Sequence, residues 1–294
     1  MGYEEQIKSL EEEIKKTPRN KASELHISFL NMRLARLKEK LEKASAKKAG
    51  TGYAVKKEGN ATVVLVGFPS VGKSTLINAL TNAGSLVAAY EFTTHNAIPG
   101  IMEYNSAKIQ IVDIPGIIDE ASKGKGEGKK VLSIARMADL ILVVIEPKEP
   151  ERLGIIKKEL HNANIRINEL PPDITIKKSI RGGLNVSSTK KLTKISIQTA
   201  KELLRGKGIV NANVVIREDV SPNQLIDFIM GNRTYIRCLF VMNKADMLSE
   251  AQKKEFSDFI LISAEKKSGL ENLKEKIWEN LGLIRVFTKA SAKT

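Results

Sequence analysis

The sequence is poor in cysteine, in aromatic side chains and in long apolar runs. Its single cysteine, Cys238, cannot form an internal disulfide, and the apolar run 238–242 around it indicates a core strand. No apolar run reaches membrane-spanning length, and the charged amino terminus, 1–13, is unlike a signal or transit peptide. These absences exclude a disulfide-built secreted scaffold and a membrane-spanning protein. We therefore expect a cytoplasmic protein that makes no membrane contact.

Negative charge is also scarce relative to positive charge, and the surplus is unevenly distributed. The 294 residues carry a net charge of +14. Residues 1–57 contribute +6 and residues 151–222 contribute +7, so the rest of the chain is close to neutral. An ordinary solvated surface is one explanation, and a footprint for a polyanion, most simply RNA, is the other.

The stretch Gly67 to Thr75, GFPSVGKST, organises the rest of the chain. It matches GxxxxGK[ST], follows an apolar run at 61–66 and precedes residues with helical spacing. Such a loop surrounds phosphate with backbone N–H groups at a helix N-terminus. In this pattern Lys73 reaches the β- and γ-phosphates, and the Ser74 hydroxyl binds magnesium. The predicted phosphate-binding residues are Pro69, Ser70, Val71, Gly72, Lys73, Ser74 and Thr75.

A second motif, Asp113-Ile-Pro-Gly116, follows an expected β-hairpin with strands at 100–104 and 108–112. This is the DxxG arrangement, forty residues beyond Lys73. The Asp113 carboxylate at the strand end would face magnesium through water, and the Gly116 N–H would meet a γ-phosphate. At this spacing and at the end of a strand, the motif indicates a sensor of the γ-phosphate.

The sequence NKAD at 243–246 follows an apolar strand and predicts the base. Asp246 can accept hydrogen bonds from the N1–H and N2–H₂ groups that guanine has and adenine lacks. Asn243 is expected beside guanine N7, the Lys244 stem over the base, and the Ala264 N–H at guanine O6. Adenine would leave buried polar groups unpaired, which favours GTP over ATP. The predicted base-binding residues are Asn243, Lys244, Asp246, Ser263 and Ala264.

Two regions lie outside the nucleotide motifs. Residues 1–50 predict two amphipathic helices and a linker, a helical hairpin that serves either as a stabilising arm or as a partner-binding surface. Residues 151–222 are too many for a simple connection, and their short strand and helix signals predict a basic α+β insert. The nucleotide-binding domain is then formed by 51–150 and 223–294, with a helix at 223–230 returning to its sheet.

With these motifs in place, the chain resembles the developmentally regulated GTP-binding protein family, within the Obg-like GTPases. The resemblance covers nearly the whole chain. It implies an α/β fold: a Ras-like P-loop G domain, whose mostly parallel sheet is flanked by helices, with an N-terminal helical hairpin and an insert similar to a ribosomal-protein domain. The segments that carry it are KTPRNKA, GFPSVGKST, YEFTT, DIPGIIDEASKGKGEGKKV, NANVVIREDVSPNQLIDFIMGNRTYIRCLFVMNKAD and KIWENLGLIRVFTK.

The same resemblance implies partners, cofactors and catalytic residues. It implies a ribosome or rRNA and a stabilising partner protein as partners, and GTP or GDP with Mg²⁺ as ligands; we expect a monomer. Thr94 is implied as the threonine that binds magnesium, with Ser74 and Asp113, when GTP is present. Lys73, Thr94 and Gly116 are the expected catalytic group.

Several positions depart from the family or from Ras-like enzymes. Ile117 stands where Ras-like enzymes place a water-orienting glutamine, so intrinsic hydrolysis should be slow. Members with this substitution often use a monovalent cation, which suggests potassium, but many have asparagine where this chain has Ser70. His95 replaces a more usual apolar residue, and we assign it no role. Family members usually continue into a C-terminal TGS domain, whereas this sequence stops at Thr294, so it is either truncated or lacks that module.

Three functions are compatible with these observations. The first is a slow GTPase that acts as a nucleotide-dependent switch on ribosomes. The second is an RNA- or ribosome-binding assembly protein in which GTP is mainly structural, and the third is a protein-interaction scaffold built on the hairpin. Thr94, Asp113 and Gly116 favour the switch, because a structural nucleotide would need no γ-phosphate sensors.

Overall fold

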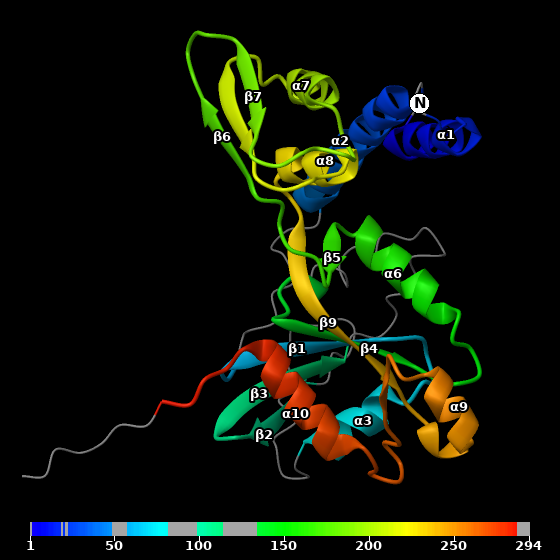
Figure 1. The fold of residues 1–294 in the computed structure, drawn as a ribbon. Coiled ribbons are helices and arrows are strands. Elements are labelled where there is room, and N and C mark those ends of the chain that lie inside the picture. The colour runs from blue at the N-terminus through cyan, green and yellow to red at the C-terminus, as the bar shows by residue number, and fades with distance from the viewer. Residues whose placement is uncertain are drawn as a thin grey trace, which may run out of the picture. The chain divides into compact units, whose positions relative to one another are not determined.

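The computed structural model describes residues 2–18, 20, 23–48, 58–81, 99–113 and 134–286. The chain forms two compact units (Figure 1). The first unit contains Met1–Gly52 and Leu170–Arg233, and the second contains Tyr53–Glu169 and Thr234–Thr294. Each unit is therefore assembled from two separate stretches of the chain.

The second unit is built on a seven-stranded sheet in the order β10-β9-β4-β1-β3-β2, with β5 pairing to β9. All pairings among these strands are parallel except that of β2 with β3. The strands are β1 (Ala61–Val66), β2 (Pro99–Tyr104), β3 (Ala107–Asp113), β4 (Leu140–Ile145), β5 (Ile165–Ile167), β9 (Thr234–Met242) and β10 (Ile260–Leu261). The described helical elements are α3 (Lys73–Leu80), α6 (Arg152–Asn162), the short 3₁₀ turn η1 (Ala245–Met247), α9 (Glu250–Glu255) and α10 (Leu270–Leu281).

The central strands of this sheet are apolar on both faces. Every residue of β1 and of β4 is buried, which is typical of parallel strands covered by helices on each side. One apolar cluster joins the sheet to α6 through residues such as Ile156, and the other joins it to α3 and α10 through residues such as Leu76 and Ile277. Five of the strands, β1, β3, β4, β9 and β10, run parallel, so their carboxyl ends lie at the same end of the sheet.

In the described part of the chain, the first unit combines four helices with a three-stranded sheet in the order β6-β8-β7. The apolar side chains of the sheet face a core shared with α2, α7 and α8, which includes Met32, Leu203, Val214 and Leu225. The α1–α2 hairpin adds a small cluster around Leu10. The elements are α1 (Tyr3–Lys16), α2 (Glu24–Lys48), β6 (Ile174–Lys178), β7 (Leu184–Ser188), α7 (Ile197–Gly206), β8 (Ala212–Ile216) and α8 (Pro222–Met230).

The elements agree with the sequence predictions, but the boundaries between units differ from the predicted ones. Residues 151–169, predicted as part of the insert, belong to the second unit, because β5 pairs with the first half of β9. The helix predicted to return to the main sheet, α8, belongs to the first unit, because Leu225, Ile226 and Met230 enter its core. The helical hairpin and the insert, predicted as separate domains, form one unit.

Within the described part of the chain, no helix has both the length and the apolar composition that crossing a bilayer requires.

Candidate functional site

The predicted nucleotide motifs lie together at the carboxyl ends of the parallel strands in the second unit's sheet. The P-loop follows β1, Asp113 ends β3, Glu146 follows β4, Asn243 follows β9, and Ser263 lies just beyond β10. Because these strands are parallel, their carboxyl ends meet, as at ligand sites of open α/β sheets. The structure thus brings together motifs that are almost two hundred residues apart in the sequence.

Two glycines allow the P-loop to pass close to its neighbours. A Cβ atom at Gly67 would lie 2.4 Å from the carbonyl oxygen of Val144, and one at Gly72 would lie 2.4 Å from Asn243 Nδ2. Gly72 also has φ +89°, a conformation that other residues rarely adopt. It immediately precedes α3, so the backbone turns from the loop into the helix at that residue.

Lys73 is held at the start of α3 with its side chain buried. Its ammonium group donates to the carbonyl oxygens of Gly67 and Phe68, both at 3.0 Å. These bonds satisfy a buried charge that would otherwise be costly. They also hold the cation at the mouth of the loop, where the motif places the β- and γ-phosphates.

Asp113 and Ser74 lie together beside the P-loop and fit a magnesium site. Ser74 Oγ donates to Asp113 Oδ2 at 3.3 Å, while Oδ1 is buried and accepts no hydrogen bond from the described residues. Burial raises the pKa of Asp113 above its ordinary 3.8, although Lys73 and the Ser74 hydroxyl oppose the shift. A hydroxyl and an unsatisfied carboxylate oxygen are hard oxygen ligands of the kind that Mg²⁺ prefers.

Asn243 connects the base-binding loop to the P-loop. Its Nδ2 donates to the carbonyl oxygen of Val71 and its Oδ1 accepts from the Ala264 N–H, each at 2.9 Å. The Ala264 N–H, which the sequence assigned to guanine O6, is thus engaged by Asn243. It must share or exchange this bond for the base to be read at O6.

Lys244 makes the second connection to the P-loop. It has a left-handed backbone, φ +60°, and its ammonium group donates to the Ser70 carbonyl oxygen at 2.9 Å and to Glu146 Oε2 at 2.6 Å. Ser70 is also left-handed, with φ +64°. Glu146 was absent from the predicted site. Its only sequence signal is an acidic residue directly after the apolar strand β4.

Asp246, the residue expected to read guanine, is paired with Lys266. The Lys266 Nζ lies 3.0 Å from Asp246 Oδ2, and the Asp246 side chain is 24% exposed. Hydrogen bonds from Lys266 and Ser263 lower the pKa of Asp246 below 3.8, so it is a carboxylate at neutral pH. Lys266 was also missed from the sequence, although it lies only two residues beyond Ala264.

Two of the predicted site residues, Thr94 and Gly116, lie outside the described residues, as do His95 and Ile117. The described site therefore comprises the P-loop, the Asp113–Ser74 pair and the base-binding loops.

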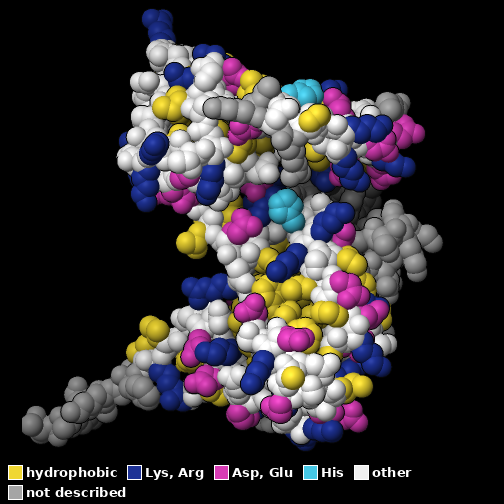
Figure 2. Space-filling view, turned by 45° about the vertical axis from the view of Figure 1, so that its right-hand side comes forward, with side chains coloured by type: hydrophobic (Ala, Val, Ile, Leu, Met, Phe, Trp, Pro, Cys, Tyr) yellow, Lys and Arg dark blue, Asp and Glu magenta, His cyan; other side chains and the backbone are white. Residues whose placement is uncertain are grey.

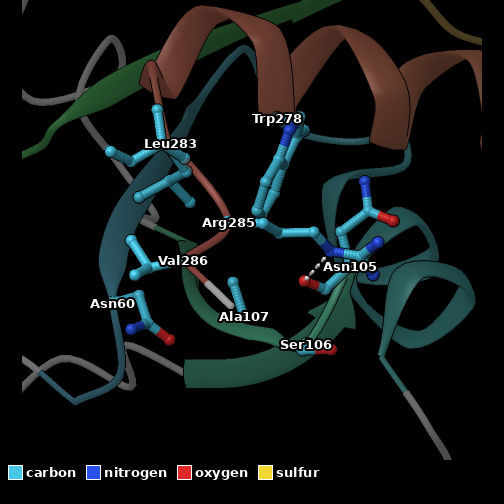
Figure 3. A pocket seen from close by; sticks show the side chains of 9 residues that line it. Asn60, Asn105, Ser106, Ala107, Trp278, Leu283, Arg285 and Val286 are labelled. Carbon is cyan, nitrogen blue, oxygen red and sulfur yellow. Dashed lines mark hydrogen bonds between the residues drawn. The ribbon is translucent and has the colours of Figure 1, made fainter. Parts of the chain in front are cut away.

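A separate hollow of about 250 Å³ lies at the other end of the sheet, beside the amino ends of β1 and β3 (Figure 3). Asn60, just before β1, and the β2–β3 turn border it, together with Trp278 and the segment after α10. Arg285 Nε donates to the Asn105 carbonyl oxygen at 3.1 Å across this region. Because the nucleotide motifs follow the carboxyl ends of the parallel strands, this hollow is not the nucleotide site.

Known proteins resemble this chain over most of its length. Residues 62–178 match a family described as "50S ribosome-binding GTPase", and residues 181–283 match the C-terminal region of that domain. A GTP-binding protein of Methanocaldococcus jannaschii is 50% identical over all of this chain and 77% of its own length. Developmentally-regulated GTP-binding protein 2 is 44% identical in its Dictyostelium discoideum homolog and 41% identical in Homo sapiens, over 98% of this chain and 81% of each relative.

A solved structure of a nucleolar GTP-binding protein 1 from Plasmodium falciparum aligns over 78% of this chain and 90% of its own, with a TM-score of 0.41 and 17% identity. The family of this chain is shown by the sequence relatives that match nearly all of it and by the matching GTPase domain. This chain is a GTP-binding protein that belongs to the developmentally regulated GTP-binding protein family.

Proposed function

We propose that this protein is a slow GTPase, hydrolysing GTP to GDP and phosphate, that acts as a nucleotide-dependent switch on ribosomes in the cytoplasm. The observation that carries the proposal is the direct bonding of the base-binding loop to the P-loop, through Asn243 to Val71 and Lys244 to Ser70. The loop that would bind the guanine base is thereby joined to the loop that would bind the phosphates.

Asp246 supplies the selectivity for guanine. As an ionised carboxylate it only accepts hydrogen bonds, which matches the two N–H donors on the guanine edge and not the acceptor at adenine N1. Bringing adenine to this position would leave the carboxylate facing an acceptor, so adenine nucleotides should bind far more weakly. Lys266 pairs with this carboxylate and must share it with the incoming base.

Magnesium would be held by Ser74 and Asp113, with Thr94 as the expected third ligand. The ion would neutralise charge on the β- and γ-phosphates. Lys73 adds a second positive charge at the P-loop, and the loop's N–H groups orient the phosphates. These residues supply charge neutralisation, which is most of what phosphoryl transfer asks of a protein.

Slow turnover follows from the absence of glutamine at position 117 of the sequence. An isoleucine cannot orient or polarise the attacking water, so hydrolysis depends on a further aid. Potassium beside the phosphates is the aid that we propose, near Ser70. Single-turnover GTP hydrolysis should therefore be faster in potassium chloride than in sodium chloride at equal ionic strength, and equal rates in both salts would contradict this part of the proposal.

Association with ribosomes is supported by the description of the matching family and by the positive charge of the first unit. The decisive experiment is co-sedimentation with ribosomes in a non-hydrolysable GTP analogue, in GDP and without nucleotide, over a salt series. The switch predicts strongest binding with the GTP analogue and weaker binding as salt rises. A stabilising partner protein would be sought among the proteins retained with the GTP analogue.

The positive charge of the first unit also supports a second candidate, an RNA-binding assembly protein in which GTP is structural. This candidate predicts ribosome binding that is equal in all three nucleotide states. The comparison of the three states thus decides between the two functions.

A further inference from the structure

The three-stranded sheet of the first unit leaves one face outside its core. Side chains alternate along the strands, so Ile174, Val186 and Val214 point into the core while their neighbours point outward. The register aligns two outward rows. One is Lys177, Asn213 and Asn185, and the other is Thr175, Val215 and Ser187.

The outward rows are polar except for Val215, and we call the surface that they form the open face. Lys177, Asn185, Ser187 and Asn213 are exposed. Among the described residues, no hydrogen bond or ion pair engages the side chains of Lys177, Asn185 or Asn213. Lysine ammonium and asparagine amide groups are therefore available to a ligand.

The surroundings of the open face are basic. Residues 170–233 contain eleven Lys or Arg against five Asp or Glu. Lys178 and Arg181 lie at the end of β6 and in the loop after it, and Lys190 and Lys191 follow β7; all four are exposed. Dark blue side chains lie along one side of the first unit in Figure 2. This charge is complementary to a phosphate backbone.

Arg217 and Asp173 border the open face at the end where β7 finishes, opposite to Lys178. Arg217 donates to Asp173 Oδ1 at 3.0 Å and to Thr175 Oγ1 at 2.8 Å. The pair neutralises the nearest carboxylate, so Asp173 does not repel an anion from the rows beside it.

Single-stranded RNA does not fit this surface well. Proteins that bind single strands stack bases on aromatic side chains. The only aromatic residue in 170–233 is Phe228, and it packs from α8 against the core. The open face thus offers charge and hydrogen bonds but no stacking platform.

Duplex RNA fits the same features. Its minor groove is wide and shallow and displays 2′-hydroxyls between phosphates, and proteins read it by shape and polar contact. Three strands present a face about 10 Å across, with short Asn, Ser and Thr side chains that can approach such a groove. We propose that the open face of the β6-β8-β7 sheet binds double-stranded RNA. This inference rests on the proposed ribosome association, to which it adds the protein surface that contacts RNA and the duplex form of that RNA.

The test compares matched single-charge variants of the full chain in direct binding to a fluorescent RNA duplex of about twenty base pairs and to the same strand alone. Asn213→Asp places a carboxylate on the open face without changing side-chain size. Gln198→Glu adds the same charge on exposed α7, where it also loses the bond from Gln198 Nε2 to Glu202 Oε1. We expect tighter binding of duplex than of single strand, a loss of roughly tenfold for Asn213→Asp and little change for Gln198→Glu.

A second pair of variants tests the phosphate contacts. Lys177→Ala should weaken duplex binding and reduce the slope of log K against log salt by about one unit, whereas Arg205→Ala on α7 should leave the slope unchanged. Equal losses within either pair, or a preference for the single strand, would overturn the proposal. All four variants should keep GDP affinity, because the nucleotide residues lie in the other unit. Nucleotide-independent ribosome binding with intact duplex binding would contradict the proposed switch alone.

Discussion

Asp113 differs from the other charged residues of the nucleotide site in its surroundings. Lys73, Lys244 and Asp246 each have oppositely charged or polar partners before any nucleotide binds. Asp113 is buried with only Ser74 bonded to it among the described residues. The site therefore keeps one carboxylate that is destabilising until a cation arrives.

Replacing Asp113 by asparagine should stabilise the nucleotide-free protein at neutral pH. The pKa of Asp113 is raised in the folded protein, so the fold favours the neutral acid. At a pH above that pKa the carboxyl ionises, and its burial then lowers the free energy of unfolding. An asparagine side chain mimics the neutral acid at every pH, so Asp113→Asn should gain about 1 kcal/mol near pH 7. The gain should vanish as pH falls below the ordinary value of 3.8. Thermal unfolding without magnesium measures the gain, and a gain that persists at low pH would contradict it.

Glu146 should control how long a guanine nucleotide stays bound. Its carboxylate holds Lys244 at 2.6 Å while Lys244 holds the P-loop, so Glu146→Gln should weaken a charge-assisted bond and speed GDP dissociation by roughly tenfold. Glu279→Gln, which loses only its pair with Lys276 on α10, is the matched control. Stopped-flow release of a fluorescent GDP distinguishes them. In Lys244→Met the Glu146 substitution should have no further effect; an additive effect would place Glu146 outside this contact.

The core of this site was predictable from the sequence because each motif is local. A P-loop, DxxG and NKxD each occupy a few consecutive residues at a strand end, and parallel strands bring those ends together. Glu146 and Lys266 were not predictable in the same way, since each acts through a partner from a distant stretch. The engagement of the Ala264 N–H by Asn243 likewise depends on how two loops pack.

At the scale of elements, the turn from P-loop to α3 depends on Gly72. Gly72→Ala combines a strained φ of +89° with a Cβ that meets Asn243 Nδ2 at 2.4 Å. It should displace Asn243 and lower GDP affinity by at least about a hundredfold, as isothermal titration would measure. Gly154→Ala in α6 is the control. Nothing lies within 4 Å of a Cβ there and its φ is ordinary, so GDP affinity should be retained. Equal loss in both variants would contradict the role of the turn.

Helix caps allow the two units to be perturbed separately. Ser221 Oγ accepts from Gln224 N at the start of α8, and Ser249 Oγ accepts from Gln252 N at the start of α9. Ser221→Ala should cost about 1 kcal/mol in the first unit, and Ser249→Ala a similar amount in the second. Hydrogen exchange of the two units should show each loss in its own unit. Loss spread over both would indicate one cooperative structure.

The helices and strands were predictable because their apolar patterns are clear, but the assignment of elements to units was not. The α8 pattern shows an apolar face without showing which core receives it. The strand β5 is too short for its sequence to reveal that it pairs with β9. Such assignments depend on long-range packing, which a local pattern does not contain.

At the scale of the whole molecule, the division into units predicts that nucleotide stabilises only one of them. All described nucleotide residues lie in the second unit. GDP with magnesium at one hundred times its dissociation constant should stabilise that unit by about 2.7 kcal/mol. Calorimetry should then show two transitions, of which one moves to higher temperature. A single transition that moves as a whole would contradict independent units.

Because each unit is assembled from two stretches of the chain, it cannot be completed until late in synthesis on the ribosome. Met32 of α2 packs in a core completed by α7, β8 and α8, which are translated long after it. At a translation rate of about 5–20 residues per second, α7, β8 and α8 are synthesised on the order of ten to forty seconds after the apolar side of α2. During that interval the core of the first unit is incomplete. An early interruption of synthesis would leave α1 and α2 with only the small cluster around Leu10 to hold them together.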